Sequence, residues 1–235
     1  MKIEVWSDYV CPFCYIGKRT LEQALEKSGY SSQAEISFKA YELDPHTPLD
    51  SKVSVYEGLA KKTGQTVEQT KKMTEGVAAH ARSVGLEYNF DQMMQVNTFT
   101  AHRLVKWAGT QGKEAPLTEL LMKNYFIEGK NVSDQHILEG AAEAVGLPRE
   151  QATAVIKSTQ FEQEVRADIE EARQIGVQGV PFFVVNRKYA ISGAQPLEAF
   201  VEALEQIGEE EGVRPASKPL GRKKTQYCTG ESCSS

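Results

Sequence analysis

Hydrophobic and polar positions alternate near the start of the chain with the two-residue period of half-buried β-strands. Ile3 and Val5 alternate with charged neighbours, and residues 36–40 repeat this pattern. Between these runs, residues 15–27 carry apolar side chains at helical spacing and stop before Gly29, a residue common at helix ends. The pattern predicts a strand–helix–strand unit, which is the crossover unit of a parallel sheet.

The middle of the chain, from about residue 50 to residue 176, lacks strand patterns and predicts a series of helices. Thr66 with Gln69, and Thr159 with Glu162, have the spacing of capping boxes that open helices. An apolar stripe then marks the last helix before Gly176. We therefore expect a block of packed helices here.

Strand patterns return after the helical block. Residues 182–185 form a short apolar run, a polar turn follows, and residues 189–191 predict another strand before a closing amphipathic helix. The chain is therefore predicted to be an α/β protein. Residues 1–47 and 177–208 form one unit, which an all-helical domain of residues 48–176 interrupts.

The composition changes again beyond Gly212. Residues 213–224 hold five basic side chains and no acidic one, with two prolines that interrupt any helix. Low apolar content is typical of a flexible tail, which we expect over residues 209–235. The basic run is interpreted as a solvated linker rather than a nucleic-acid contact.

Charge and hydropathy limit the partners of the chain. A net charge of -5 over 235 residues argues against a nucleic-acid-binding surface on the body of the protein. No run of about eighteen apolar residues is present, so no membrane partner is expected. The first residues resemble a strand rather than a secretory leader, which favours a cytoplasmic location.

Four cysteines form two close pairs, Cys11 with Cys14 and Cys228 with Cys233. In a reducing compartment such pairs suggest redox chemistry or metal binding more than structural bridges. The first pair lies in Cys11-Pro12-Phe13-Cys14, between a predicted strand and a predicted helix. This setting favours redox chemistry over half of a structural zinc site, and no metal or cofactor is expected.

A thiolate rather than a thiol attacks a disulfide, so a redox site must favour the charged form of one cysteine. The free N–H groups and the positive dipole end of a helix N-terminus do this for the first cysteine. We therefore expect Cys11 to be the exposed nucleophile and Cys14 the buried resolving partner. Pro12 suits the first helical turn because its missing N–H would have no partner there.

Gly179-Val180-Pro181 directly precedes the predicted strand of residues 182–185. A proline is sterically allowed as the first residue of a strand, and on its own this one needs no function. Few X–Pro bonds are cis. Together with the cysteine motif, however, the segment favours a cis bond, whose turn would leave the Val180 backbone free to pair with an extended substrate.

These motifs in combination resemble the DsbA family of thioredoxin-fold proteins over about residues 1–208. The resemblance is carried by Ser7-Asp8-Tyr9-Val10-Cys11-Pro12-Phe13-Cys14, the helical block, and Gly179-Val180-Pro181. Residues 41–45 and 97–104 resemble the FrnE-like branch, some members of which also carry a C-terminal Cys-x4-Cys like that of Cys228 and Cys233.

The resemblance implies a thioredoxin-like fold with a large helical insertion, a cis-Pro181 facing the cysteines, and dithiol–disulfide exchange. Phe13 departs from the histidine that the strongly oxidising periplasmic members have between their cysteines. A neutral aromatic side chain cannot hold a thiolate by charge, so the disulfide should be less oxidising. We therefore expect a cytoplasmic disulfide reductase or isomerase that acts on protein or peptide disulfides, with a small-molecule thiol as a candidate electron donor.

Several other residues are candidates for the site. Val180, Pro12, Phe13 and Phe182 are expected to contact substrate, and Trp6 and Tyr15 are candidates for the same apolar groove, although aromatic residues are more often core. Asn97, predicted to cap a helix, and His102 on that helix are further candidates near the cleft. Asp8, Lys18 and Arg19 are candidates for tuning Cys11. Cys228 and Cys233 form either a second redox pair that exchanges with Cys11 or two unstructured thiols.

Three other interpretations stay open. The first is the glutathione-linked branch of the same fold, the kappa-type transferases and the 2-hydroxychromene-2-carboxylate isomerases, in which a serine stands where Cys11 does. The intact cysteine pair favours dithiol exchange over that branch. The others are a non-catalytic redox-sensing adaptor and a four-thiolate zinc site formed by Cys11, Cys14, Cys228 and Cys233.

Overall fold

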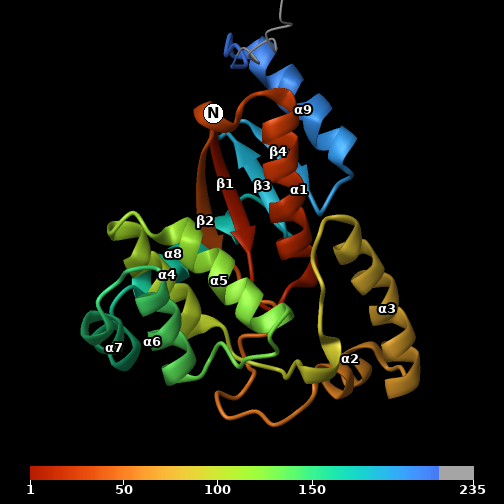
Figure 1. The fold of residues 1–235 in the computed structure, drawn as a ribbon, viewed down its shortest axis with the longest axis vertical. Helices are drawn as coiled ribbons and strands as arrows, with labels where there is room; N and C mark the ends of the chain where they lie inside the picture. The colour runs from red at the N-terminus through yellow and green to blue at the C-terminus, as the bar shows by residue number, and fades with distance from the viewer. Residues whose placement is uncertain (217–235) are drawn as a thin grey trace, which may run out of the picture.

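One mixed sheet lies at the centre of the computed structural model, which describes residues 1–216 (Figure 1). Its strands are β1 (Lys2–Ser7), β2 (Glu35–Ala40), β3 (Phe182–Val185) and β4 (Tyr189–Ser192), in the order β2-β1-β3-β4. The central strand β1 runs parallel to β2 and antiparallel to β3. Because β1 and β3 are neighbours, the sheet joins the two ends of the described chain.

The first crossover follows the predicted pattern. Helix α1 (Pro12–Ser28) connects β1 to β2 and ends at Gly29, whose φ of 81° is a left-handed conformation that favours glycine. Lys2 pairs with Glu35, and the parallel register then runs along both strands to Ser7 and Ala40. The predicted strand–helix–strand unit is confirmed.

Helices fill the chain between β2 and β3, as predicted. They are α2 (Val55–Thr63), α3 (Val67–Ser83), α4 (Phe99–Thr110), α5 (Glu114–Phe126), α6 (Gln135–Ala144), α7 (Arg149–Lys157) and α8 (Glu162–Gln174), with the short 3-10 turn η2 (Phe90–Gln92). Another such turn, η1 (Ser31–Gln33), precedes β2. In Figure 1, α4 to α7 gather at the lower left, whereas α2 and α3 lie at the lower right. The α/β class with a helical insertion is therefore confirmed.

One predicted capping box is present and the other is not. The Thr66 side chain accepts a hydrogen bond from the Gln69 N–H, and the Gln69 side chain bonds back to the Thr66 N–H. The box expected from Thr159 to Glu162 is wrong, because α8 begins only at Glu162. Phe161 takes the N-cap position in a left-handed conformation with φ of 62°, and no side chain caps this helix.

The two faces of the sheet are covered by different helices. Ile3, Val5 and Phe183 face α1 and the closing helix α9 (Leu197–Glu210), in one buried apolar cluster. On the opposite face, Trp6 packs with Ala172 of α8, and its Nε1 donates a hydrogen bond of 2.9 Å to the Asp168 carbonyl. Helix α1, which starts at the cysteine motif, is thus packed against a sheet that is covered on both faces.

The closing helix and the residues after it are ordered past residue 209, where the predicted tail starts. Helix α9 extends to Glu210, and the Val213 N–H bonds to the Gly208 carbonyl at 2.8 Å. The Ala216 N–H then bonds to the Gly29 carbonyl at 2.8 Å, so residues up to 216 are attached at the C-terminal end of α1. Cys228 and Cys233 lie outside the described residues. No helix of the described part is long and apolar enough to cross a membrane.

Candidate active site

The cysteine motif lies where the lower end of β1 in Figure 1 turns into α1. Cys11 is the N-cap residue of α1 with an extended backbone, and Pro12 is its first helical residue. Two hydrogen bonds fix the turn. The Cys11 N–H donates to the Asp8 carbonyl at 3.1 Å, and the Cys14 N–H donates to the Cys11 carbonyl at 3.0 Å. Cys11 therefore stands at a helix N-terminus, as predicted.

The fold brings the cysteine motif and the proline segment together. Cys11 Sγ donates a hydrogen bond of 3.3 Å to the Val180 carbonyl, across 169 positions of sequence. The Val180–Pro181 peptide bond is cis, as the resemblance implied. Pro181 packs against α1 at Gly17, where an added Cβ would lie only 2.9 Å from the proline ring.

Burial of the two sulfurs differs from the expectation in one respect. Cys14 is only 1% exposed, as expected for a resolving cysteine, but Cys11 is only 4% exposed rather than open to solvent. The reason is that Cys11 belongs to the apolar cluster of the helical insertion and its sulfur is directed at the Val180 carbonyl. Cys11 Sγ is thus enclosed between the helical insertion and the Val180 carbonyl.

The two cysteines influence each other electrostatically. Burial raises the pKa of the Cys14 thiol well above its usual range, and the adjoining Cys11 side chain raises it further through a hydrogen bond and through its charge. Cys14 is thus held in its protonated form, mainly by burial.

Tyr88 reaches the motif from the helical insertion, although no spacing in the sequence indicates this. Its Oη donates a hydrogen bond of 2.7 Å to the carbonyl of Pro12, the residue after Cys11. Its ring stacks on Phe126 at 4.7 Å between centroids. Such a contact depends on tertiary packing alone.

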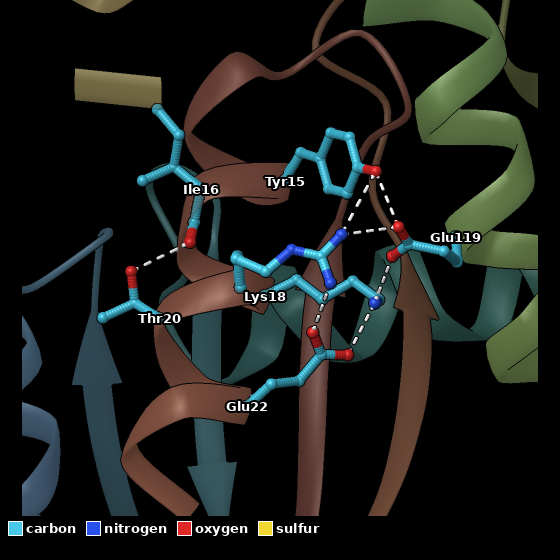
Figure 2. A network of polar contacts seen from close by, with 7 residues as sticks. Tyr15, Ile16, Lys18, Thr20, Glu22 and Glu119 are labelled. Carbon is cyan, nitrogen blue, oxygen red and sulfur yellow. Dashed lines mark hydrogen bonds and ion pairs between the residues drawn. The ribbon is translucent and has the colours of Figure 1, made fainter. Parts of the chain in front are cut away.

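A polar network ties α1 to α5 just beyond the motif (Figure 2). Glu119 of α5 accepts hydrogen bonds from Tyr15 Oη at 2.6 Å, from Lys18 Nζ at 2.5 Å and from Arg19 at 2.6 Å. Glu22 of α1 also binds both cations, at 2.6 Å and 3.1 Å. Lys18 and Arg19 are therefore engaged in holding the helix rather than turned toward Cys11.

We expect Glu119→Gln to destabilise the protein by about 1–2 kcal/mol at neutral pH, because Lys18 is buried and loses a charged partner. Burial by itself would raise the pKa of Glu119, but hydrogen bonds from Lys18 and Tyr15 and the two positive charges outweigh it and lower the pKa. A carboxylate whose pKa is lowered by folding contributes stability above its unfolded pKa and loses it as the pH falls through the folded pKa. Urea unfolding at decreasing pH should therefore show the difference from wild type shrinking in acid.

Glu22→Gln is the matched control for this prediction. It neutralises a carboxylate on the same two cations but within α1, where such helical pairs contribute about 0.3–0.5 kcal/mol. If Glu119→Gln costs no more than Glu22→Gln at neutral pH, the link between α1 and α5 does not stabilise the site.

Asp8 and His102 lie together behind the motif. The Asp8 carboxylate is 1% exposed, accepts the Leu43 N–H at 2.8 Å and has its other oxygen 3.4 Å from His102 Nε2. The same His102 nitrogen is 3.1 Å from the Tyr41 carbonyl, and its ring lies 4.7 Å from that of Tyr9. One Asp8 oxygen is thus hydrogen-bonded to Leu43, whereas the other, which faces His102, is buried without a hydrogen-bond partner in the described part of the chain.

Asn97 does not cap α4 in the expected way. Thr98 is the N-cap residue without a side-chain hydrogen bond, and Asn97 precedes it. The Asn97 side chain instead accepts the Phe99 N–H at 3.0 Å and donates to the Thr47 carbonyl at 3.1 Å. It joins the start of α4 to the segment after β2, because its side chain bonds to both.

The expected aromatic groove is only partly present. Trp6 and Tyr15 are buried core residues, which is the alternative that the sequence left open for them. Phe13 is 41% exposed beside the cysteines, with its ring 6.3 Å from that of His80. Phe182 packs against Trp6 at 6.5 Å, in the cluster under α8. Phe13 is thus the open apolar side chain of the motif.

Metal binding finds no support in the described part of the chain. Within residues 1–216, no group of three or more His, Cys, Asp or Glu side chains is arranged to hold a metal ion. The four-thiolate arrangement requires Cys228 and Cys233, which lie beyond these residues, and so it stays a hypothesis.

Comparison with known proteins agrees with this geometry. A family model described as DSBA-like thioredoxin domain matches residues 2–205. The chain is similar to the probable DsbA oxidoreductase SCO1869 from Streptomyces coelicolor, with 35% identity, a TM-score of 0.84 and 94% of each chain covered. It is also similar to the uncharacterised protein YwbO of Bacillus subtilis, with 26% identity over 86% of this chain and 94% of that protein.

The structure is also similar, at much lower sequence identity, to an enzyme with a different activity. A 2-hydroxychromene-2-carboxylate isomerase has a TM-score of 0.67 at 13% identity, with 90% of this chain and 98% of that chain covered. This level of identity shows a shared fold alone. Because proteins with different activities share the fold, the function has to be argued from the residues of the site.

Proposed function

Since this chain belongs to the DSBA-like thioredoxin domain family, we propose that it exchanges dithiols and disulfides with protein or peptide substrates through Cys11 and Cys14. The observation that carries the proposal is the hydrogen bond of 3.3 Å between Cys11 Sγ and the Val180 carbonyl. Through this contact a substrate chain that pairs with Val180 beside cis-Pro181 places its disulfide at Cys11.

The first step is attack of the Cys11 thiolate on the substrate disulfide. A bond forms between Cys11 Sγ and one substrate sulfur, the substrate S–S bond breaks, and the other substrate sulfur leaves as a thiolate that takes up a proton. Cys11 is the N-cap of α1, so the free N–H groups of the first helical turn favour negative charge at its sulfur.

The second step uses the raised pKa of Cys14. Burial and the neighbouring Cys11 side chain keep Cys14 protonated before substrate arrives. Once Cys11 is bonded to substrate it is neutral, and one cause of the raised pKa disappears. As Cys14 Sγ bonds to Cys11 Sγ, the bond from Cys11 Sγ to the substrate sulfur breaks, and the Cys14 proton passes to the departing substrate thiolate, so two electrons pass from the protein to the substrate.

The residues beside Cys11 support a proposal for the direction of exchange. Phe13 carries no charge to stabilise a thiolate, so we propose a reductase or isomerase rather than a strong oxidant, acting in the cytoplasm. Return to the dithiol consumes two molecules of a small-molecule thiol, which become one disulfide. The intact Cys11–Cys14 pair favours this chemistry over that of the glutathione-dependent isomerases.

Insulin reduction and the refolding of scrambled ribonuclease test the proposal. With a small-molecule thiol present, the wild-type protein is expected to accelerate both reactions. An inactive wild type would overturn the proposal, and a tail deletion lacking residues 217–235 shows whether the described part is sufficient.

Cys228 and Cys233 are proposed as a second redox pair, and the described residues set a geometric condition for it. Ala216 is bonded to Gly29 at the far end of α1, a helix of 17 residues that is about 25 Å long. The twelve residues from 216 to 228 span at most about 40–43 Å when extended. Cys228 is therefore within reach of Cys11.

Peptide mapping of mixed disulfides in Cys14→Ser tests this exchange. We expect a disulfide between Cys11 and Cys228 or Cys233, because the resolving cysteine is missing and a tail thiol can take its place. The same mapping on Cys14→Ser with both tail cysteines replaced by serine is the control. If Cys11 is never linked to a tail cysteine, the second pair does not exchange with the first.

A further inference from the structure

Tyr88 acts on the peptide unit between the two cysteines. It lies in the segment between α3 and η2, 76 positions from Pro12, and its Oη donates a hydrogen bond of 2.7 Å to the Pro12 carbonyl. We propose that Tyr88 is a positioning residue of disulfide exchange, which holds the motif in the shape that lets Cys14 reach Cys11. This inference rests on the oxidoreductase function proposed above and extends it to a residue of the helical insertion.

The Tyr88 ring is fixed on several sides, so its hydroxyl has a defined position. It stacks on Phe126 at 4.7 Å and 24°, meets the edge of Phe90 at 5.9 Å and 78°, and stacks with Tyr15 at 6.2 Å and 19°. Phe126 is itself 1% exposed. A side chain held by three rings transmits the position of the insertion to the motif.

The hydroxyl also stays a hydrogen-bond donor during exchange. Burial raises the pKa of Tyr88 far above its usual value, and the charges of Cys11 and Cys14 raise it further. The phenol is therefore protonated in every charge state of the two sulfurs, and its bond to Pro12 does not depend on which cysteine is ionised.

The step that depends on this bond is resolution of the mixed disulfide. Cys14 Sγ bonds to Cys11 Sγ, the bond from Cys11 Sγ to the substrate sulfur breaks, and the electron pair leaves with the substrate thiolate, which takes up a proton. Intramolecular attack of this kind is sensitive to small displacements of the reacting atoms. Without the Tyr88 bond, the dithiol and the mixed disulfide gain backbone freedom, whereas the closed disulfide keeps its covalent restraint.

Tyr88→Phe removes the hydroxyl and keeps the ring. We expect resolution of a mixed disulfide between Cys11 and glutathione to slow about threefold to tenfold, since one net hydrogen bond is involved. The dithiol–disulfide equilibrium with glutathione should shift toward the dithiol by a similar factor, about 15–30 mV for two electrons. The rate at which iodoacetamide alkylates Cys11 should change by less than about twofold, because this reaction needs no second cysteine.

Tyr125→Phe is the matched control. Tyr125 Oη donates to the Met94 carbonyl at 2.8 Å and its ring contacts the same Phe126 at 4.9 Å, but the bond is to a carbonyl outside the motif. Both variants should lose a few degrees of melting temperature, about 2–4 °C for each kcal/mol in a protein of this size. Only Tyr88→Phe should change the resolution rate.

Two results would overturn the assignment of Tyr88. One is a resolution rate in Tyr88→Phe equal to that of wild type or to that of Tyr125→Phe. The other is an equal loss of resolution and of Cys11 alkylation in Tyr88→Phe, which would indicate a general disturbance of the site. Failure of the proposed oxidoreductase function has a different signature, because the wild-type protein itself would then not resolve the mixed disulfide.

Discussion

Cys11→Ser is expected to reduce insulin at the rate of the small-molecule thiol alone, whereas Cys14→Ser keeps the first chemical step and accumulates a mixed disulfide. A hydroxyl at position 11 cannot form a disulfide with substrate, so no intermediate arises. With serine at position 14, Cys11 still attacks from the helix N-terminus, but Cys14 is not there to release the substrate. The variant is studied with Cys228 and Cys233 also replaced by serine, so that no tail thiol takes its place. Turnover then depends on external thiol and should fall by at least about tenfold.

Mass spectrometry after incubation with a disulfide peptide measures this asymmetry directly. One peptide should be found on Cys14→Ser, attached at Cys11, and none on Cys11→Ser. Because Cys14 is fully buried, serine there leaves a hydroxyl in an apolar cluster, so Cys14→Ala serves as a control that keeps apolar burial. Attachment at Cys14 in Cys11→Ser would mean that the two roles are reversed.

The strands and α1 were accessible from the sequence because each has a local cause, whereas the cis bond of Pro181 was expected from its combination with the cysteine motif and from the family resemblance. Alternating apolar positions predict β1 and β2, Gly29 ends α1, and Pro181 opens β3. The capping box at Thr159 failed for a reason of the same kind. Phe161 adopts a left-handed conformation that its type does not favour, and this moves the start of α8 beyond the box.

The supporting residues of the site were not accessible in this way. Tyr88 contacts a residue of α1 that is 76 positions away in the sequence, and Glu119 contacts one that is about a hundred positions away. No periodicity relates either residue to the cysteines. Burial of Cys11 likewise depends on the insertion packing over the motif. The sequence thus predicts which atoms react, whereas the residues that hold them depend on contacts between distant segments.

Asp168→Ala is expected to destabilise the protein by about 3–5 kcal/mol, the largest loss we expect for a residue outside the cysteine motif. Asp168 of α8 is 5% exposed and binds Lys39 of β2 at 3.1 Å and Lys106 of α4. Its carboxylate also accepts the Ala40 N–H at 2.9 Å. The substitution removes a negative charge from the partly buried Lys39 and Lys106, and it leaves the buried Ala40 N–H without its acceptor. The two free-energy costs add.

Urea unfolding of Asp168→Ala beside Glu170→Ala separates this effect from the general cost of removing an acidic residue from α8. Glu170 lies on the same helix and pairs at the surface with Arg173, an arrangement that contributes less than about 1 kcal/mol. Asp168→Asn, which keeps an acceptor for Ala40, should fall between the two. Equal losses in Asp168→Ala and Glu170→Ala would show that the buried carboxylate does not fasten α8 and α4 to the sheet. A larger loss of stability in Asp168→Ala would show that the Asp168 contacts hold the helical insertion, which carries Tyr88 and Glu119, against the sheet. These contacts lie on the face of β1 opposite to α1.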